Sequence, residues 1–84
     1  MSKPYEALFA IGDRVVVEDR SVLEKFAREW KYHNPLMPSQ IDSAGMHSTV
    51  KDVGFYHGGD PIYQLENVEG TWHEGCLKAS THAA

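Results

Sequence analysis

The segment His73-Glu74-Gly75-Cys76 gathers the side-chain types that most often do chemistry. Imidazole, carboxylate and thiolate groups are the common zinc ligands, and a thiol beside an imidazole is a potential nucleophile. However, the chain has one cysteine, no paired two-residue ligand spacing, and other histidines dispersed at positions 33, 47, 57 and 82. We therefore expect no metal site and no cofactor. Cys76 is expected to be a small buried residue, and His73 an exposed strand residue.

A catalytic pairing of Cys76 with His73 is not expected either. Residues three apart at the end of an extended strand point away from each other, and no orienting acid or oxyanion donor is identifiable. The segment His57-Gly58-Gly59 could present backbone N–H groups to an anion. A hairpin that needs glycine for its backbone angles explains the same residues, so we assign no catalytic residue.

Aromatic side chains are the stronger functional signal, because aromatic-lined grooves bind extended peptides and Trp and Tyr are frequent interface anchors. We expect Phe55, Tyr63 and, by helix phase, Trp30 to contribute to the core, and Tyr32, Tyr56 and Trp72 to be exposed. The candidate binding residues are Trp30, Tyr32, Tyr56, Trp72 and His73.

These residues must be positioned by short elements. A β-branched strand is expected over 13–17, after Gly12. A helix of about ten residues should follow from Ser21, whose spacing to Glu24 fits a capping box. One face of that helix is apolar, with Val22, Leu23, Phe26, Ala27 and Trp30. Asn34-Pro35 then ends the helix, and 33–45 is expected to be a loop with one helical turn after Ser39.

The sequence pattern in the second half of the chain predicts β-strands. The strand over 46–56 needs a bulge near Lys51-Asp52, because the alternation of apolar residues breaks between Val50 and Val53. Turn residues at 57–61 and 67–70 separate it from a strand at 62–66 and from another that starts at Trp72, with Leu77 as a final apolar anchor.

Composition limits the possible functions. The chain has 84 residues and a net charge of −4 with histidine neutral, and its eight basic residues are scattered, so nucleic-acid binding is not favoured. Residues 1–6 lack the apolar stretch of a signal peptide, and the longest apolar run, 7–11, is too short to cross a membrane. We expect a cytoplasmic protein with one domain, 1–84.

The order of these motifs along the chain resembles that of a known group of small β proteins. Gly12-Asp13-Arg14-Val15, a bulged strand, and Tyr63-x-Leu65-x-x-Val68-x-Gly70-x-Trp72 resemble small SH3-like barrels. Such barrels occur in phage and mobile-element proteins, in the nitrile hydratase β subunit and in the plasmid-borne dihydrofolate reductase. The resemblance implies a mainly β, five-stranded SH3-like barrel, with the helix and loop at about 21–45 inserted after the first strand.

The resemblance does not carry over an activity. The pore-lining Val-Gln-Ile-Tyr run of the plasmid reductase aligns here with Thr71-Trp72-His73-Glu74, and the nitrile hydratase β family uses its barrel to pack against a separate metal-holding subunit. Our expectation is a non-catalytic protein-interaction or self-associating module of bacterial or mobile-element origin. The alternative is a small enzyme or small-molecule-binding protein whose site forms at an oligomer interface, with His57, Tyr63, Trp72 and His73 near it. A third class is a weak nucleic-acid binder.

Overall fold

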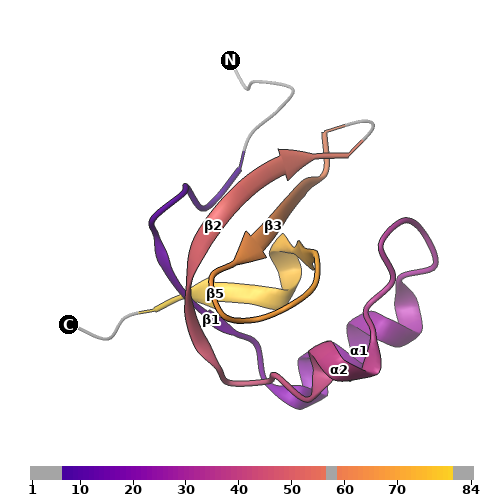
Figure 1. Ribbon diagram of the computed structural model, residues 1–84. Coiled ribbons are helices and arrows are strands. Elements are labelled where there is room, and N and C mark those ends of the chain that lie inside the picture. Colours follow the sequence, from indigo (N-terminus) through magenta and orange to yellow (C-terminus); the bar gives the residue numbers. More distant parts are fainter. Residues whose placement is uncertain (1–6, 57–58, 81–84) are drawn as a thin grey trace.

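A computed structural model of the chain describes residues 7–56 and 59–80 (Figure 1). Its elements follow in the order β1 (Arg14–Val17), α1 (Arg20–Glu29), α2 (Pro38–Ile41), β2 (His47–Phe55), β3 (Pro61–Leu65), β4 (Trp72–His73), η1 (Glu74–Cys76) and β5 (Leu77–Ala79). No helix within the described ranges is long and apolar enough to cross a membrane. The chain is therefore a small, mainly β protein with a short helical insertion.

The five strands form one antiparallel sheet in the order β4-β3-β2-β1-β5. The long β2 bends through the molecule, so that its first half pairs with β1 and its second half with β3 (Figure 1). Within residues 7–56 and 59–80, no ladder joins the outer strands β4 and β5, although η1 links them along the chain. The five strands and the helix are confirmed, but a closed barrel is not.

The bulge in β2 lies where the alternation of apolar residues breaks. The register with β3 shifts between Val50 and Asp52, so Lys51 is the extra residue. Val50 is consequently buried in the core, whereas Val53 is only partly buried. The bulge predicted at Lys51-Asp52 is confirmed, and it lets one strand serve both halves of the sheet.

The helix α1 starts one residue earlier than predicted, and its cap differs. Asp19 is the N-cap residue and makes no side-chain capping hydrogen bond, so the capping box of Ser21 and Glu24 is wrong. Glu24 instead forms an ion pair with Arg20, at 3.3 Å from Nε. Both side chains are about half exposed, so this i, i+4 pair contributes only a few tenths of a kcal/mol.

The insertion shares the core of the sheet. Leu23 of α1 and Leu36 of the following loop are buried in the same cluster as β-strand residues such as Val15, Val17 and Leu65. Figure 1 shows α1 and α2 together at one side of the sheet. Burying a leucine is worth about 1.5–3 kcal/mol, so removing the insertion would open the core rather than trim a peripheral loop.

The short helix α2 is tied to the loop before β4. The Gln40 carboxamide oxygen accepts a 2.9 Å hydrogen bond from the Met37 N–H, and Gln40 Nε2 donates a 3.0 Å bond to the Thr71 carbonyl oxygen. Gly70, at φ 109°, passes so close that a Cβ there would lie 2.6 Å from Gln40 Nε2. The glycine is therefore needed both for its backbone angle and for this approach.

Candidate functional site

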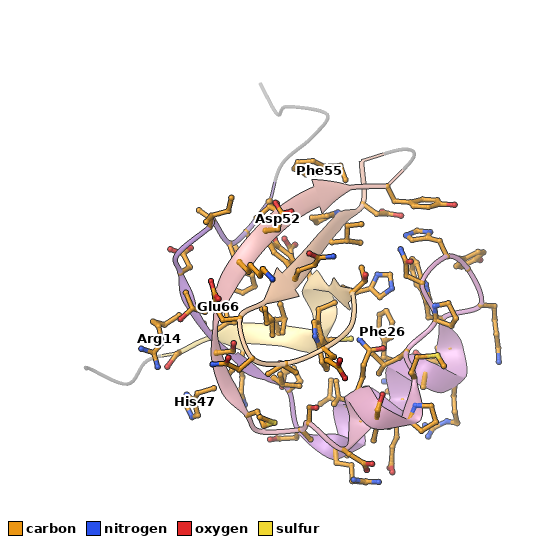
Figure 2. The ribbon with its side chains drawn as sticks, in the orientation of Figure 1. Arg14, Phe26, His47, Asp52, Phe55 and Glu66 are labelled. Carbon is orange, nitrogen blue, oxygen red and sulfur yellow. The ribbon has the colours of Figure 1, made fainter. Side chains whose placement is uncertain are left out.

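A cluster of aromatic and imidazole rings lies where the insertion meets the sheet. Phe26 of α1 points toward the sheet (Figure 2) and stacks on Trp30, with ring centroids 5.4 Å apart. The His73 ring of β4 lies 4.9 Å from Phe26 and 4.8 Å from Trp30. His33 is 5.2 Å from Trp30 and 5.5 Å from His73. We call Phe26, Trp30, His33 and His73 the ring cluster.

The ring cluster extends to the β2–β3 connection through a stacked pair. The imidazole of His33 lies flat on Tyr56, with centroids 3.6 Å apart and an interplanar angle of 8°. His33 Nε2 is buried, has no hydrogen-bond partner, and lies 3.7 Å from Oδ2 of Asp60. The loop after α1 and the segment after β2, distant in sequence, are thus held face to face.

Two hydrogen bonds fix the backbone beneath these rings. The Trp30 indole N–H donates to the His33 carbonyl oxygen at 2.7 Å. His73 Nε2 lies 2.8 Å from the Asn34 carbonyl oxygen. Because a carbonyl only accepts, Nε2 must carry a proton in this contact. Asn34 adopts φ 49°, a left-handed conformation that asparagine tolerates. This conformation turns the backbone just before Pro35.

Two tyrosines form the exposed edge of the cluster, which we call the exposed rim. Tyr32 is 71% exposed and packs its ring edge-to-face on Trp30 at 5.1 Å. Tyr56 is 39% exposed and stacks on His33. The same insertion also exposes Met37. The exposure predicted for Tyr32 and Tyr56 is confirmed, while Trp30 is partly buried and supports the rim from beneath.

Two candidate residues lie elsewhere than predicted. Trp72 is fully buried and His73 is 5% exposed, so the expectation that both are exposed is wrong. The reason differs for the two residues: Trp72 belongs to the buried core cluster, whereas the rings of Phe26 and Trp30 cover His73. The prediction for Phe55 is wrong in the opposite sense. Phe55 is expected in the core, but it is 39% exposed near the far end of β2, away from the helices (Figure 2).

Sequence reasoning missed His33 and Asp60 as members of this region. In the sequence His33 is only one of several dispersed histidines, yet it contacts Trp30, Tyr56 and His73. The spacing from Trp30 to His33 is not a usable helical signal, because α1 ends at Glu29 and Trp30 already has an extended backbone. The contacts with Tyr56 and His73 require the tertiary arrangement and have no local signal.

The groups of the His73–Cys76 segment are not assembled for catalysis. Burial raises the pKa of the Cys76 thiol to about 12, which leaves it protonated and unreactive. Glu74 Oε2 accepts hydrogen bonds from the Tyr63 hydroxyl and from the Leu8 N–H, each at 2.7 Å. Among residues 7–56 and 59–80, no group of three or more His, Cys, Asp or Glu side chains could hold a metal ion.

Among the open hollows that the described residues form outside the ring cluster, two are wide. One of about 430 Å³ lies at the β3–β4 loop and is lined mainly by polar side chains, including Lys51, Gln64, Glu66 and Glu69. The other, of about 460 Å³, lies between the β1–β5 pair and the start of β2, beside His47 and Lys78. Neither hollow is lined by a candidate binding residue, and neither brings together a nucleophile and a base. The rings therefore remain the best-defined feature.

The fold and the ring cluster define a small, mainly β protein with the exposed tyrosines Tyr32, on its helical insertion, and Tyr56, after β2. In comparisons with known proteins, no family model, no curated protein and no solved structure matches this chain. Its function must therefore be argued from its own residues.

Proposed function

We propose that the chain is a non-catalytic protein-interaction module that self-associates through its exposed rim. The observation that carries this proposal is Tyr32, a large aromatic side chain that is 71% exposed yet rests on the Trp30 ring. An aromatic side chain already held against a rigid support loses little conformational entropy on binding, which is the property of an interface anchor.

The charges next to the rim support a second copy as the partner. Lys31 precedes Tyr32 and is exposed, while Asp60 lies beside the His33–Tyr56 stack with its side chain 55% exposed. In a two-fold dimer the same patch meets itself, so a patch with both signs of charge can pair lysine with aspartate across the axis. Charges at such an edge would set orientation and association rate, and the tyrosines would supply the affinity.

The same proposal includes an SH3-like barrel as the framework. The strand order, the bulge in β2 and the single-turn helix η1 before the last strand support it. In this arrangement the insertion between β1 and β2 faces the β2–β3 connection, and the ring cluster fills the space between them. The alternative of a shared pore has less support, because Tyr63 and Trp72 expose no surface from which to line one.

Sedimentation equilibrium of the wild-type protein over a wide concentration range tests this proposal. We expect a mass that rises from monomer to dimer with concentration. A mass that stays monomeric at the highest concentrations would exclude self-association.

A further inference from the structure

His73 joins the edge of the sheet to the insertion. From β4, its ring contacts Phe26 and Trp30 at the end of α1, and its Nε2 donates to the Asn34 carbonyl oxygen in the following loop. The residue is 5% exposed. A single buried imidazole therefore fixes both the helix end and the loop that carries Tyr32.

Few charges face this imidazole among the described residues. His33 lies 5.5 Å away in the loop, and Asp60, after β2, lies beyond His33 at 3.7 Å from its Nε2. Tyr56 covers His33, and Tyr32 packs on Trp30. The neighbouring carboxylate of Glu74 is engaged by Tyr63 and Leu8. On α1, the basic residues Lys25 and Arg28 and the acidic residue Glu29 are solvent-exposed.

The neutral form of His73 is the one that these surroundings favour. Burial lowers its pKa from the ordinary value of 6.5; the hydrogen bond to Asn34 opposes this shift, proximity to His33 adds to it, and Asp60 opposes it. Since Nε2 already carries the proton shared with Asn34, a second proton from solvent must go to Nδ1. It would create an imidazolium packed against Phe26 and Trp30.

We propose that His73 is an acid-sensitive latch, whose protonation loosens residues 30–34 from β4 and thereby displaces the Tyr32 surface. A charged imidazole regains hydration only if the rings over it move away. The effect of the latch on self-association rests on the proposed function, but the local release does not.

The direction of the pH dependence follows from linkage. A histidine with a lowered pKa in the closed form binds its proton more readily once the cluster opens. The closed form therefore keeps its full stability above about pH 6.5, the ordinary histidine pKa, and loses stability as pH falls through the lower pKa of His73. Attraction of a cation to the aromatic rings acts against this release.

The direct test is an NMR titration of the histidine rings in the wild-type protein from pH 8 to 4.5, with His73 assigned by comparison with His73→Phe or, if that variant fails to fold, through the ring contacts of His73. We expect the Nε2-protonated tautomer at high pH and a midpoint below 6.5 for His73. The Trp30 indole N–H signal should shift with the same midpoint, because its bond to His33 belongs to the displaced segment. A His73 midpoint at or above pH 6.5, or a Trp30 indole signal that does not shift with that midpoint, would contradict the proposal that His73 acts as a latch.

A pair of variants adds a second readout. His73→Phe keeps a ring in the cluster but cannot be protonated, whereas His47→Gln changes an exposed histidine of β2. Between pH 7.5 and 5.0, the melting temperature of His73→Phe should fall less than that of wild type, and His47→Gln should behave as wild type. Equal falls in all three proteins would contradict the proposal. If His73→Phe does not fold, the wild-type titration decides.

These measurements separate the latch from the proposed function. A His73 midpoint below 6.5 coupled to Trp30 in a protein that stays monomeric would support the latch and contradict self-association. Concentration-dependent dimerisation without that coupling would support self-association and contradict the latch.

Discussion

The hydroxyl of Tyr63 donates a 2.7 Å hydrogen bond to Glu74 Oε2, the same oxygen that accepts the Leu8 N–H. The Tyr63 oxygen in turn accepts the Phe9 N–H at 3.2 Å, and the two rings meet edge-to-face at 5.5 Å. A fully buried side chain of β3 thus holds the segment before β1 against η1. This small network closes one end of the core.

Removing the Tyr63 hydroxyl should therefore destabilise the fold. Tyr63→Phe leaves the ring packing intact but deprives the Phe9 N–H of its acceptor and Glu74 of one donor. We expect a loss of about 1–3 kcal/mol in the free energy of unfolding, measured by urea denaturation. Tyr32→Phe is the matched control, since the Tyr32 side chain is largely exposed, and it should change stability by less than about 0.5 kcal/mol. Equal effects would mean that the network contributes nothing.

Tyr63 should also set an alkaline limit on stability. Burial, followed by the hydrogen bond to Glu74, raises the pKa of Tyr63 to about 12 from an ordinary value of 10.0. Because the folded pKa lies above the unfolded one, stability is full below pH 10 and declines as pH rises toward 12. Urea denaturation at pH 9, 10 and 11 should show this decline in wild type and a smaller one in Tyr63→Phe. A decline of the same size in both proteins would assign it to other groups.

Trp72 and Phe55 exchange the roles that the sequence predicts, which makes their alanine variants informative. Trp72 is fully buried, so Trp72→Ala should cost about 3–5 kcal/mol through cavity formation, enough to unfold a domain of this size. Phe55→Ala, at a residue that is 39% exposed, should cost clearly less. Thermal unfolding followed by circular dichroism measures both. A larger loss for Phe55→Ala would contradict the observed packing.

Local patterns predicted the elements of this fold better than their packing. The apolar spacing of Leu23, Phe26 and Trp30 indicated α1, and the broken alternation between Val50 and Val53 indicated the bulge. Each of these signals is read within one element. The burial of Trp72 depends instead on the core cluster, and that of His73 on Phe26 and Trp30, which lie some 40 residues earlier in the chain. No periodicity within β4 contains that information.

For the candidate site, too, local features could be predicted from the sequence and tertiary contacts could not. Tyr32 follows a helix whose end could be placed, and Tyr56 is the last residue of the strand predicted over 46–56, so the exposure of both was predictable. His33 could not be recognised as a cluster residue, because its partners Tyr56 and His73 come from two other parts of the chain. Asp60 acquires its place beside His33 only through the same tertiary contact.

The Cys76 thiol should not react with thiol reagents in the folded protein. The thiol is fully buried and its pKa is raised to about 12, so almost no thiolate forms at neutral pH. We expect no reaction with Ellman's reagent at pH 8 over many minutes, and rapid reaction of one thiol in 6 M guanidinium. Fast modification without denaturant would show that the segment around η1 opens readily.

The most direct test of the central claim compares the self-association of Tyr32→Ala with that of Ile11→Ala by sedimentation equilibrium. Both wild-type side chains are large and similarly exposed, at 71% and 65%, but Ile11 lies in the segment before β1 and outside the exposed rim. We expect Tyr32→Ala to weaken dimerisation at least about tenfold, the effect of losing an interface anchor, and Ile11→Ala to leave it unchanged. Equal dimerisation constants for wild type and Tyr32→Ala would contradict the claim that the protein associates through this rim.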